Sequence, residues 1–349
     1  MNLSRVAGGL LIVCAVFLMF ANFFATANPG AIDENLPYLP PEGIHFKSPT
    51  GQLHLRPFIL RHRPVNGQFA KYAEADEKIV PLYFFVRTNT QSEPGGRSAR
   101  VLRLCGINGE YPGDSPHFLG TDEFGRDVWS RLLYGGRTTV AIGFVAALIA
   151  SLLAVIFGLV AGLLRGWVDT LIMRLVETMI SVPWFYLLLA VRAMLPLRAG
   201  PWATLATSTL LLALIGWARP ARILRGAAIE ARQHAYVTMA QASGASLWHL
   251  VQWHILPDLA PQAITQFTVL LPQFIASEIA LSYFGLGVEE PLVSWGGMLA
   301  AAQHLSSIVE YPWLMSPLWA MIPLFFAVHL LADRYACKPP PTMSSFSFE

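Results

Sequence analysis

Glu278 is the one carboxylate well inside a long apolar run of the sequence, Ile264–Leu286. An ionisable side chain inside a membrane is costly, so it usually faces a cavity or a partner. Pro272, six residues earlier, predicts a helix that is loosened at that point. Two interpretations stay open. Glu278 belongs to a pathway or gate, or it caps a helix break near the outer face and binds the backbone amides of Ser282–Leu286.

The sequence lacks the short motifs that mark several common catalytic sites. It has no G-x-x-x-x-G-K-[ST] run, so it has no phosphate-cradling loop with which to hydrolyse ATP by that route. It also has no H-E-x-x-H run and no G-x-S-x-G run, which argues against a metalloprotease and an elbow-type serine hydrolase. We therefore predict a non-catalytic chain that binds no cofactor of its own.

Neither a metal site nor a disulfide is predicted. His254 has no cysteine or carboxylate spacing around it that indicates a metal, so it is interpreted as an ordinary interfacial histidine. Cys14 lies in an apolar run, Cys105 in a polar segment and Cys337 near the end of the sequence. Three different environments argue against a disulfide framework.

The composition indicates a protein that crosses a membrane several times. Of the 349 residues, 54% are hydrophobic and 13% are charged, whereas a soluble domain carries about 25% charged residues. The net charge of +2 gives no indication of nucleic-acid binding. A helix crosses a bilayer with roughly 20 apolar residues, and six such runs are predicted. They are Val6–Ala27, Thr138–Leu164, Leu171–Leu195, Trp202–Ala218, Ile264–Leu286 and Trp313–Ala332.

The first apolar run allows two interpretations. Arg5 supplies a charged start, and Ala25-Thr26-Ala27 resembles the cleavage site of a signal peptide. However, the apolar core is about twenty residues long, beyond the usual 7–15 of a signal peptide. We therefore favour an uncleaved anchor over residues 1–27.

A segment of different character, residues 28–136, follows the anchor. It is rich in arginine, lysine and acids, it is broken by proline and glycine, and only Val80–Val86 is typical of a strand. We predict an extramembrane segment with few regular elements, followed by a transmembrane domain over residues 137–333 and a tail over residues 334–349.

The orientation is predicted from lysine and arginine in the short loops, which favour the cytoplasm. The loop Gly287–Pro312 contains neither residue but carries three glutamates, whereas Arg198 is a minor exception in its own loop. Both termini and the loop from Arg219 to Pro257 are therefore expected in the cytoplasm, and residues 28–136 outside. The bases on which this depends are Arg165, Arg174, Arg219, Arg222, Arg225, Arg232, Arg334 and Lys338.

Residues 236–257 stand out as an ordered connection between two apolar runs. The pattern predicts two short helices joined at Ala242-Ser243-Gly244, where glycine takes backbone angles that other residues resist. Pro257 is expected to end the second helix. A short, amphipathic and basic-flanked segment suits docking to another protein at the membrane surface.

Three long motifs, in order, carry a resemblance to one family. They are His117–Arg137 (HFLGTDEFGRDVWSRLLYGGR), Arg222–Pro257 and Glu278–Leu299 (EIALSYFGLGVEEPLVSWGGML). Together they resemble the permease subunit of peptide-importing ABC transporters, of the dipeptide/oligopeptide permease C type, over roughly residues 117–334. The resemblance implies an all-α, six-crossing permease of the type I importer fold in a bacterial inner membrane.

The second motif resembles the cytoplasmic coupling helices of that family, in which Glu-Ala-Ala precedes a glycine. Here Thr238, Met239 and Ala240 stand at those positions, so the glutamate is missing, whereas Gly244 and the His254–Pro257 run agree. The docking surface is expected from Tyr236, Val237, Leu247, Trp248, Leu250 and Val251. The coupling residues that the resemblance implies are Tyr236, Val237, Ala240, Gly244, Ala245, His254, Leu256 and Pro257.

The first motif has its own physical interpretation. Asp127 is a candidate helix N-cap, and the residues after it form an amphipathic helix over residues 127–134. This is either an interfacial helix that acts as part of a gate or lid, or an extension of the next crossing with arginines that reach to the headgroups. The outer-face motif comprises Gly120, Thr121, Asp122, Gly125, Arg126 and Asp127, and the pathway or gate residues are Glu278, Gly285, Gly287 and Trp295.

Further expectations concern ion pairs, aromatic anchors and partners. Arg174 and Glu177 are three residues apart on a helix and can pair, a structural role that we favour. Trp295, Tyr311 and Trp313 are expected at the outer interface. The implied partners are a second homologous permease, two ATP-binding subunits that hold ATP and Mg, an external substrate-binding protein and the lipid bilayer.

Other functions remain open from the sequence alone. Cargo such as nickel or a glycan-derived peptide would fit the same family. An ion-coupled secondary transporter would need a mid-membrane site, for which Glu278 is the candidate. A receptor or assembly protein would act through residues 28–130. The segment Asn28–His117 is longer than the family predicts, and contact with the binding protein is one role for it.

Overall fold

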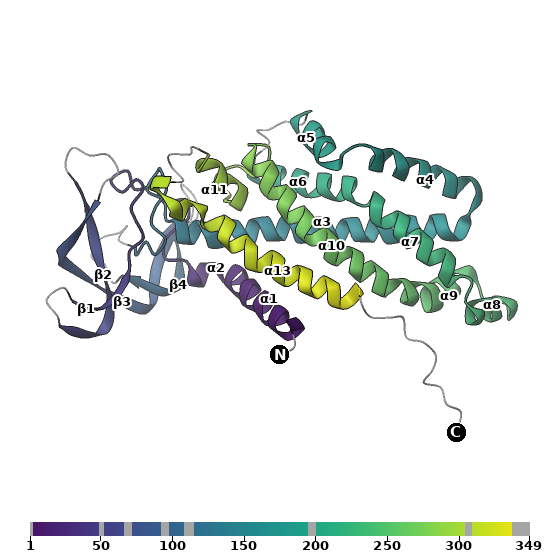
Figure 1. Ribbon diagram of the computed structural model, residues 1–349, viewed down its shortest axis with the longest axis horizontal. Helices are drawn as coiled ribbons and strands as arrows, with labels where there is room; N and C mark the ends of the chain where they lie inside the picture. The colour runs from purple at the N-terminus through teal and green to yellow at the C-terminus, as the bar shows by residue number, and fades with distance from the viewer. Residues whose placement is uncertain are drawn as a thin grey trace, which may run out of the picture. The chain divides into compact units, whose positions relative to one another are not determined.

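The computed structural model describes residues 3–48, 52–65, 72–91, 98–107, 115–194, 200–303 and 309–336 (Figure 1). The predicted tail beyond Ala336, with Cys337 and Lys338, lies outside these residues, and so does Arg198. The chain divides into two compact units, and the divisions fall inside helices. The first unit contains residues 1–11, 141–278 and 323–349, and the second contains residues 12–140 and 279–322.

The second unit contains a four-stranded antiparallel sheet in the order β1-β2-β3-β4 (Figure 1). The predicted strand Val80–Val86 is confirmed, because it lies inside β3. The expectation of an all-α protein with few regular elements before residue 137 is wrong. Aromatic and β-branched residues favour these strands, and pairing buries Phe58, Ile59 and Leu82. The strands are β1 (Ile44–Lys47), β2 (Leu53–Pro64), β3 (Tyr72–Gln91) and β4 (Ser98–Ile107).

The first apolar run forms two helices. Helix α1 (Leu3–Met19) ends before the predicted limit, and the four-residue α2 (Ala21–Phe24) follows it. Ala25 then takes an extended conformation. The end of this run is held in the second unit, where Ala21 and Ala25 pack with Leu133 and Trp129.

Helix α3 (Val128–Leu164) is continuous over 37 residues. The predicted crossing from Thr138 is therefore part of a longer helix, and the separate interfacial helix near residues 127–134 is wrong. The alternative of a helix extension is correct. Of the three arginines expected to reach the headgroups, Arg137 is exposed, whereas Arg126 and Arg131 are buried. Ion pairs, rather than water or headgroups, satisfy these two side chains.

The third predicted crossing is broken in two. Helix α4 (Gly166–Ser181) and helix α5 (Trp184–Met194) meet at an angle of 89°. Pro183 stands at the break: it lacks an amide proton, and it forces the preceding Val182 into an extended conformation with φ −87° and ψ 133°. The fourth crossing, α6 (Pro201–Gly216), bends by 44° into α7 (Ala218–Ala231).

The predicted interruption of the fifth crossing is not observed. Helix α10 (Leu256–Tyr283) runs without a break through Pro261, Pro272 and Glu278. It is preceded by α8 (Ala235–Ala242), α9 (Leu247–Leu250) and a π-helical turn η1 (Val251–Ile255). After α10 come α11 (Trp295–Ala301), a 3₁₀ turn η2 (Pro312–Met315) and α13 (Ser316–Ala336). The sixth predicted crossing, Trp313–Ala332, begins in η2 and continues in α13.

Length and composition single out the helices that are able to span a membrane. Among the described residues, three qualify: Val128–Leu164, Leu247–Tyr283 and Pro312–Leu330. The number becomes five if each of the bent pairs α4–α5 and α6–α7 is one span. The apolar part of α1, Gly8–Met19, is shorter. Six crossings therefore remain a prediction.

Candidate functional site

The turn between α8 and α9 requires a glycine at position 244. Gly244 has φ +85°. Its amide donates to the carbonyl of Gln241 at 3.1 Å, and the Ala245 amide donates to the carbonyl of Ala240 at 3.1 Å. This pair of hydrogen bonds is the Schellman arrangement that ends a helix at a left-handed residue. The predicted junction of two short helices is confirmed.

The residues expected to form the docking surface divide into two groups. Val237 and Leu250 are buried within the chain, and Val251 packs with Ile255 and Leu259 in a core. Val237 and Leu250 therefore hold the segment in place, and their expected docking role is wrong. Val251 is only partly buried, and its docking role stays a prediction.

Other apolar side chains of the segment are exposed and so are free to contact a partner. Leu247 is 54% exposed and Trp248 is 72% exposed, as the docking prediction requires. Met239 is 70% exposed and was not included in that prediction, because it stands at a position where the resembling motif has alanine. We call Met239, Leu247 and Trp248 the apolar surface of α8–α9.

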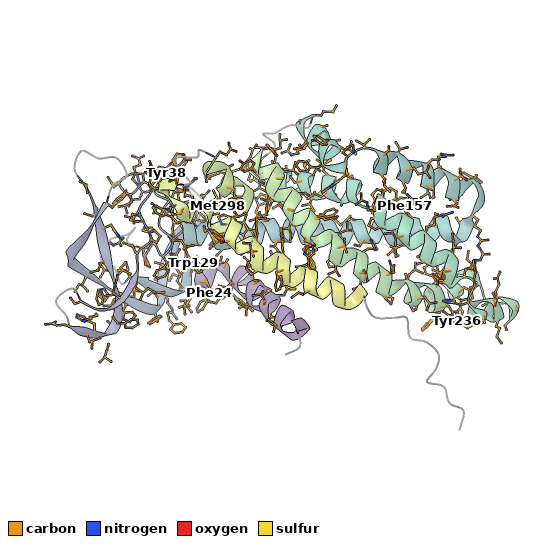
Figure 2. All side chains as sticks on the ribbon, viewed as in Figure 1. Phe24, Tyr38, Trp129, Phe157, Tyr236 and Met298 are labelled. Carbon is orange, nitrogen blue, oxygen red and sulfur yellow. The ribbon has the colours of Figure 1, made fainter. Side chains whose placement is uncertain are left out.

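Tyr236 holds the base of α8 to the start of α10. Figure 2 labels Tyr236. Its hydroxyl donates to the Asp258 carboxylate, and His234 Nδ1 lies 2.9 Å from that hydroxyl and 3.1 Å from Asp258 Oδ2. Burial and the Asp258 carboxylate raise the pKa of Tyr236 to about 12, so the phenol stays a donor at neutral pH. The ring of His254 is centred 5.8 Å from that of Tyr236.

Pro257 does not end the helix as expected, because it lies in the first turn of α10 beside Leu256. The π-helical turn η1 directly precedes it, and such turns accommodate a local disruption of the hydrogen-bond ladder. Helix α9 is thereby continuous with the long α10.

Two further arginines connect α7 to its neighbours. Arg225 forms a bidentate pair with Asp169 of α4, at 2.5 Å from Nε and 2.6 Å from the second nitrogen. Arg232 donates to the carbonyl of Leu163 at 2.9 Å. Sequence analysis missed the first pair, because 56 residues separate its members. The predicted pair of Arg174 and Glu177 is confirmed at 3.3 Å on an exposed face.

The predicted N-cap Asp127 is confirmed. Its Oδ2 accepts from the Ser130 amide at 2.8 Å and from the Thr26 hydroxyl at 2.9 Å. Its Oδ1 lies 3.0 Å from His117 Nδ1. One buried carboxylate therefore joins the start of α3 to two other parts of the second unit.

Asp122, Arg126, Arg131 and Glu290 form a cluster of four charges in the second unit. Arg126 Nε donates to Asp122 Oδ2 at 2.7 Å. Arg126 and Arg131 both donate to Glu290 Oε1, at 2.5 and 3.0 Å. Arg131 also lies 3.6 Å from Asp122. We call these four residues the charge cluster, which attaches the loop before α11 to α3.

The two glycines of the outer-face motif let the backbone of the 33–39 segment approach the motif closely. Gly120 and Gly125 have φ +70° and +71°. A Cβ on Gly120 would lie 2.3 Å from the carbonyl oxygen of Leu39, and one on Gly125 would lie 1.9 Å from that of Asp33. The Thr121 hydroxyl accepts from the Leu39 amide at 2.8 Å. The motif is thus a packed polar junction.

The Glu290 carboxylate gives the second unit an expected acid sensitivity. Burial alone would raise its pKa, but Arg131 and Arg126 outweigh this and lower the pKa below its ordinary value of 4.5. A lowered pKa stabilises the fold at pH values above 4.5, and this contribution is lost as the pH falls through the lowered value.

We therefore expect the difference in melting temperature between the parent and Glu290→Gln in detergent to be constant above about pH 5 and to shrink on acidification. A difference that stays constant down to the acid limit of folding would contradict this role. Glu289→Gln, which makes the same change of charge at the neighbouring residue, serves as the control.

Three of the four proposed pathway residues, Gly285, Gly287 and Trp295, lie in the second unit. Gly287 and Trp295 are buried there, whereas Gly285 is exposed. Trp295 is 3% exposed, and its indole donates to the carbonyl of Leu132 at 2.9 Å, so its expected place at an exposed interface is wrong. Gly285 has φ +71°. A Cβ on Gly287 would lie 2.0 Å from the Ser282 hydroxyl oxygen.

Glu278 is fully buried inside α10. The cap interpretation is wrong for three of the proposed amides, because those of Phe284, Gly285 and Leu286 donate to backbone carbonyls. Arg192 of α5 is also fully buried and was missed, although it stands alone in an apolar run. A pathway or gate role for Glu278 stays a prediction.

Comparison with known proteins identifies the family. The family described as "Binding-protein-dependent transport system inner membrane component" matches residues 154–336. The dipeptide transport system permease protein DppC of Bacillus subtilis (strain 168) is 35% identical over 67% of this chain and 71% of its own length. The oligopeptide transport system permease protein OppC of Escherichia coli (strain K12) is 36% identical over 63% of this chain and 70% of its own length.

A solved structure of the MetNI methionine ABC transporter in inward-facing conformations has a TM-score of 0.46 and 16% identity, and it covers 58% of this chain and 94% of its own. The chain belongs to the family of binding-protein-dependent transport system inner membrane components. It is therefore a membrane permease component rather than an enzyme, in agreement with the prediction from its missing catalytic motifs.

Proposed function

We propose that this chain is a permease subunit of an ATP-driven importer of peptides. The names of its relatives, dipeptide and oligopeptide transport permeases, support the cargo class. In this proposal the chain adopts the type I importer fold and forms half of the pathway with a second, homologous permease. Two ATP-binding subunits hold ATP and Mg, and an extracytoplasmic binding protein delivers the peptide.

The orientation follows from the arginines. In this proposal the arginines of α7 face the cytoplasm, and α8, α9 and both termini lie on that side of a bacterial inner membrane. The sheet and the charge cluster then lie on the outer side. There the sheet is available to the binding protein.

The observation that carries the proposal is the apolar surface of α8–α9. Met239, Leu247 and Trp248 are all more than half exposed on a segment that is otherwise held by buried residues and hydrogen bonds. An exposed apolar group on a rigid support fits a groove on a partner protein. The missing glutamate at Thr238 is consistent with docking that depends on apolar contact.

Two contacts would transmit the movement of a docked ATPase subunit to the long helices of this chain. Tyr236 connects α8 to α10 through Asp258, whereas Arg232 connects the end of α7 to Leu163 near the end of α3. A force on the apolar surface therefore acts on long helices. Coupling also requires that the ATPase bind this surface differently in its two nucleotide states. Alternating access of the pathway would follow from that difference.

Trp248→Glu tests this role. We expect the variant to reach the membrane but to recover at least about tenfold less ATPase subunit on purification in mild detergent, since a buried charge in an apolar groove costs more than about 1.4 kcal/mol. Thr238→Glu is the matched control, because it places the same charge on exposed α8 where the resembling motif has glutamate. Equal recovery of the ATPase with both variants would contradict docking through Trp248.

A further inference from the structure

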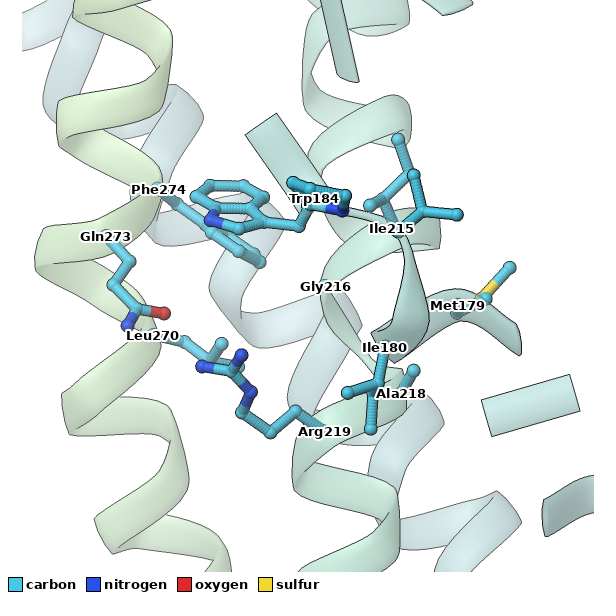
Figure 3. Close-up of a pocket in the computed structure, with 12 residues that line it drawn as sticks. Met179, Ile180, Trp184, Ile215, Gly216, Ala218, Arg219, Leu270, Gln273 and Phe274 are labelled. Atoms are coloured by element: carbon cyan, nitrogen blue, oxygen red, sulfur yellow. The ribbon is translucent and has the colours of Figure 1, made fainter. Parts of the chain in front are cut away.

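A cavity of about 140 Å³ lies in the first unit where both bent helix pairs meet α10 (Figure 3). Pro183 and Trp184 line it at the break between α4 and α5. Gly216 and Arg219 line it at the bend between α6 and α7. In membrane transporters, binding sites commonly form at such interrupted helices. The remaining lining residues are Met179, Ile180, Val182, Ile215, Ala218, Leu270, Gln273 and Phe274.

Two polar side chains come together in this cavity. Figure 3 shows the Arg219 guanidinium directed toward the carboxamide of Gln273. Within the part of the chain that the structure describes, neither side chain has a hydrogen bond or an ion pair with another residue. Arg225, on the same helix as Arg219, is by contrast paired with Asp169. Both side chains are exposed and line the cavity, so a ligand can reach them.

The other walls are apolar and firmly placed. The rings of Trp184 and Phe274 are centred 6.4 Å apart. Phe274 packs directly on Gly216, where a Cβ would lie 2.2 Å from the ring. Among these mostly apolar walls, Arg219 supplies the cation and Gln273 supplies a carboxamide.

We infer that this cavity binds the terminal carboxylate of the transported peptide. The Arg219 guanidinium donates two parallel hydrogen bonds to the carboxylate, the geometry in which arginine binds such groups most strongly. The Gln273 carboxamide donates a third. A volume of about 140 Å³ admits several water-sized groups, and hence a carboxylate with its α-carbon. This inference rests on the proposed function, because it names the part of the cargo that the permease contacts.

The test compares uptake of one peptide with that of its C-terminal amide by the complete transporter in liposomes. Loss of a charge-assisted pair is worth about 1.5–3 kcal/mol. Arg219→Gln is therefore expected to lower uptake of the free acid at least about tenfold and to leave uptake of the amide unchanged. Arg219→Lys should retain part of the uptake of the free acid. Gln273→Leu should lower that uptake less than Arg219→Gln does. Arg174→Gln, which removes an exposed arginine paired with Glu177, is the control.

A second readout does not depend on delivery by the binding protein. With the native cysteines replaced by serine, the free acid should slow modification of Gln273→Cys by a charged thiol reagent, whereas the amide should not. Equal effects of acid and amide in both assays would overturn the carboxylate site while leaving the importer proposal intact. Absence of ATP-dependent uptake of any peptide by the parent complex would instead overturn the proposed function.

An anionic lipid headgroup is the other group that could occupy the cavity, and a change of lipid composition distinguishes it from the peptide carboxylate. The uptake assay is repeated in vesicles of phosphatidylcholine alone and in vesicles that also contain phosphatidylglycerol. If Arg219→Gln changes uptake only in the anionic vesicles, and equally for acid and amide, the cavity holds a lipid headgroup and the inference is wrong. An effect confined to the free acid in both vesicles supports it.

Discussion

Gly244→Pro is expected to lower peptide uptake at least about tenfold while the amount of the subunit in the membrane stays unchanged. Proline fixes φ near −65°, whereas Gly244 has φ +85°. Proline also removes the amide that donates to Gln241. Both changes reorient α9, and with it Leu247 and Trp248, relative to Met239 on α8. The ATPase would then meet a disrupted apolar surface.

Three substitutions of Gly244, by asparagine, alanine and proline, separate the effect of the backbone angle from a general effect of mutation at this position. No atom lies within 4 Å of a Cβ placed on Gly244, so only the backbone angle limits the substitution. Asparagine tolerates the left-handed region and should retain most of the uptake. Alanine, at a cost of roughly 1–2 kcal/mol in that region, should lie between asparagine and proline. Normal uptake by the proline variant would refute the coupling role of the turn.

Asp122→Ala is expected to destabilise the second unit by about 3–5 kcal/mol, the range measured when one partner of a buried ion pair is removed. Arg126 and Arg131 are both buried, and without Asp122 only Glu290, whose side chain is 57% exposed, balances their charges. The backbone amides of Phe124 and Arg126 would also lose their acceptor. Thermal unfolding in detergent measures the effect.

Glu123→Ala is the matched control for this prediction, because it removes an exposed carboxylate one residue away. It should change the melting temperature little, as is usual for surface substitutions. If the two variants melt at the same temperature, the charge cluster does not stabilise the unit.

Local signals predicted much of this chain correctly. The apolar run of α3, the N-cap at Asp127, the junction at Gly244 and the pair of Arg174 and Glu177 each depend on residues that are close in sequence. For the same reason Val80–Val86 was predicted as a strand. The family also followed from local motifs, because three long runs stand in the right order.

The errors concern contacts between distant residues. The sheet was missed because charged residues interrupt its strands, and pairing between strands supplies the burial that each lacks alone. Arg126 and Arg131 were expected to reach headgroups, but Asp122 and Glu290 hold them. Val237 and Leu250 were assigned to docking because sequence alone does not distinguish an apolar side chain that packs within the chain from one that faces outward. The effect of Pro183 was local but was overlooked beside a long apolar run.

ATP-dependent uptake of a labelled peptide tests the central proposal most directly. The chain is purified from its native membrane in mild detergent with the subunits that accompany it, and the complex is reconstituted in liposomes with the binding protein. We predict recovery of a second permease and ATP-binding subunits, and uptake that requires ATP and is lost in Gly244→Pro. A stable chain recovered alone, or a complex that moves peptide without ATP, would contradict the proposal.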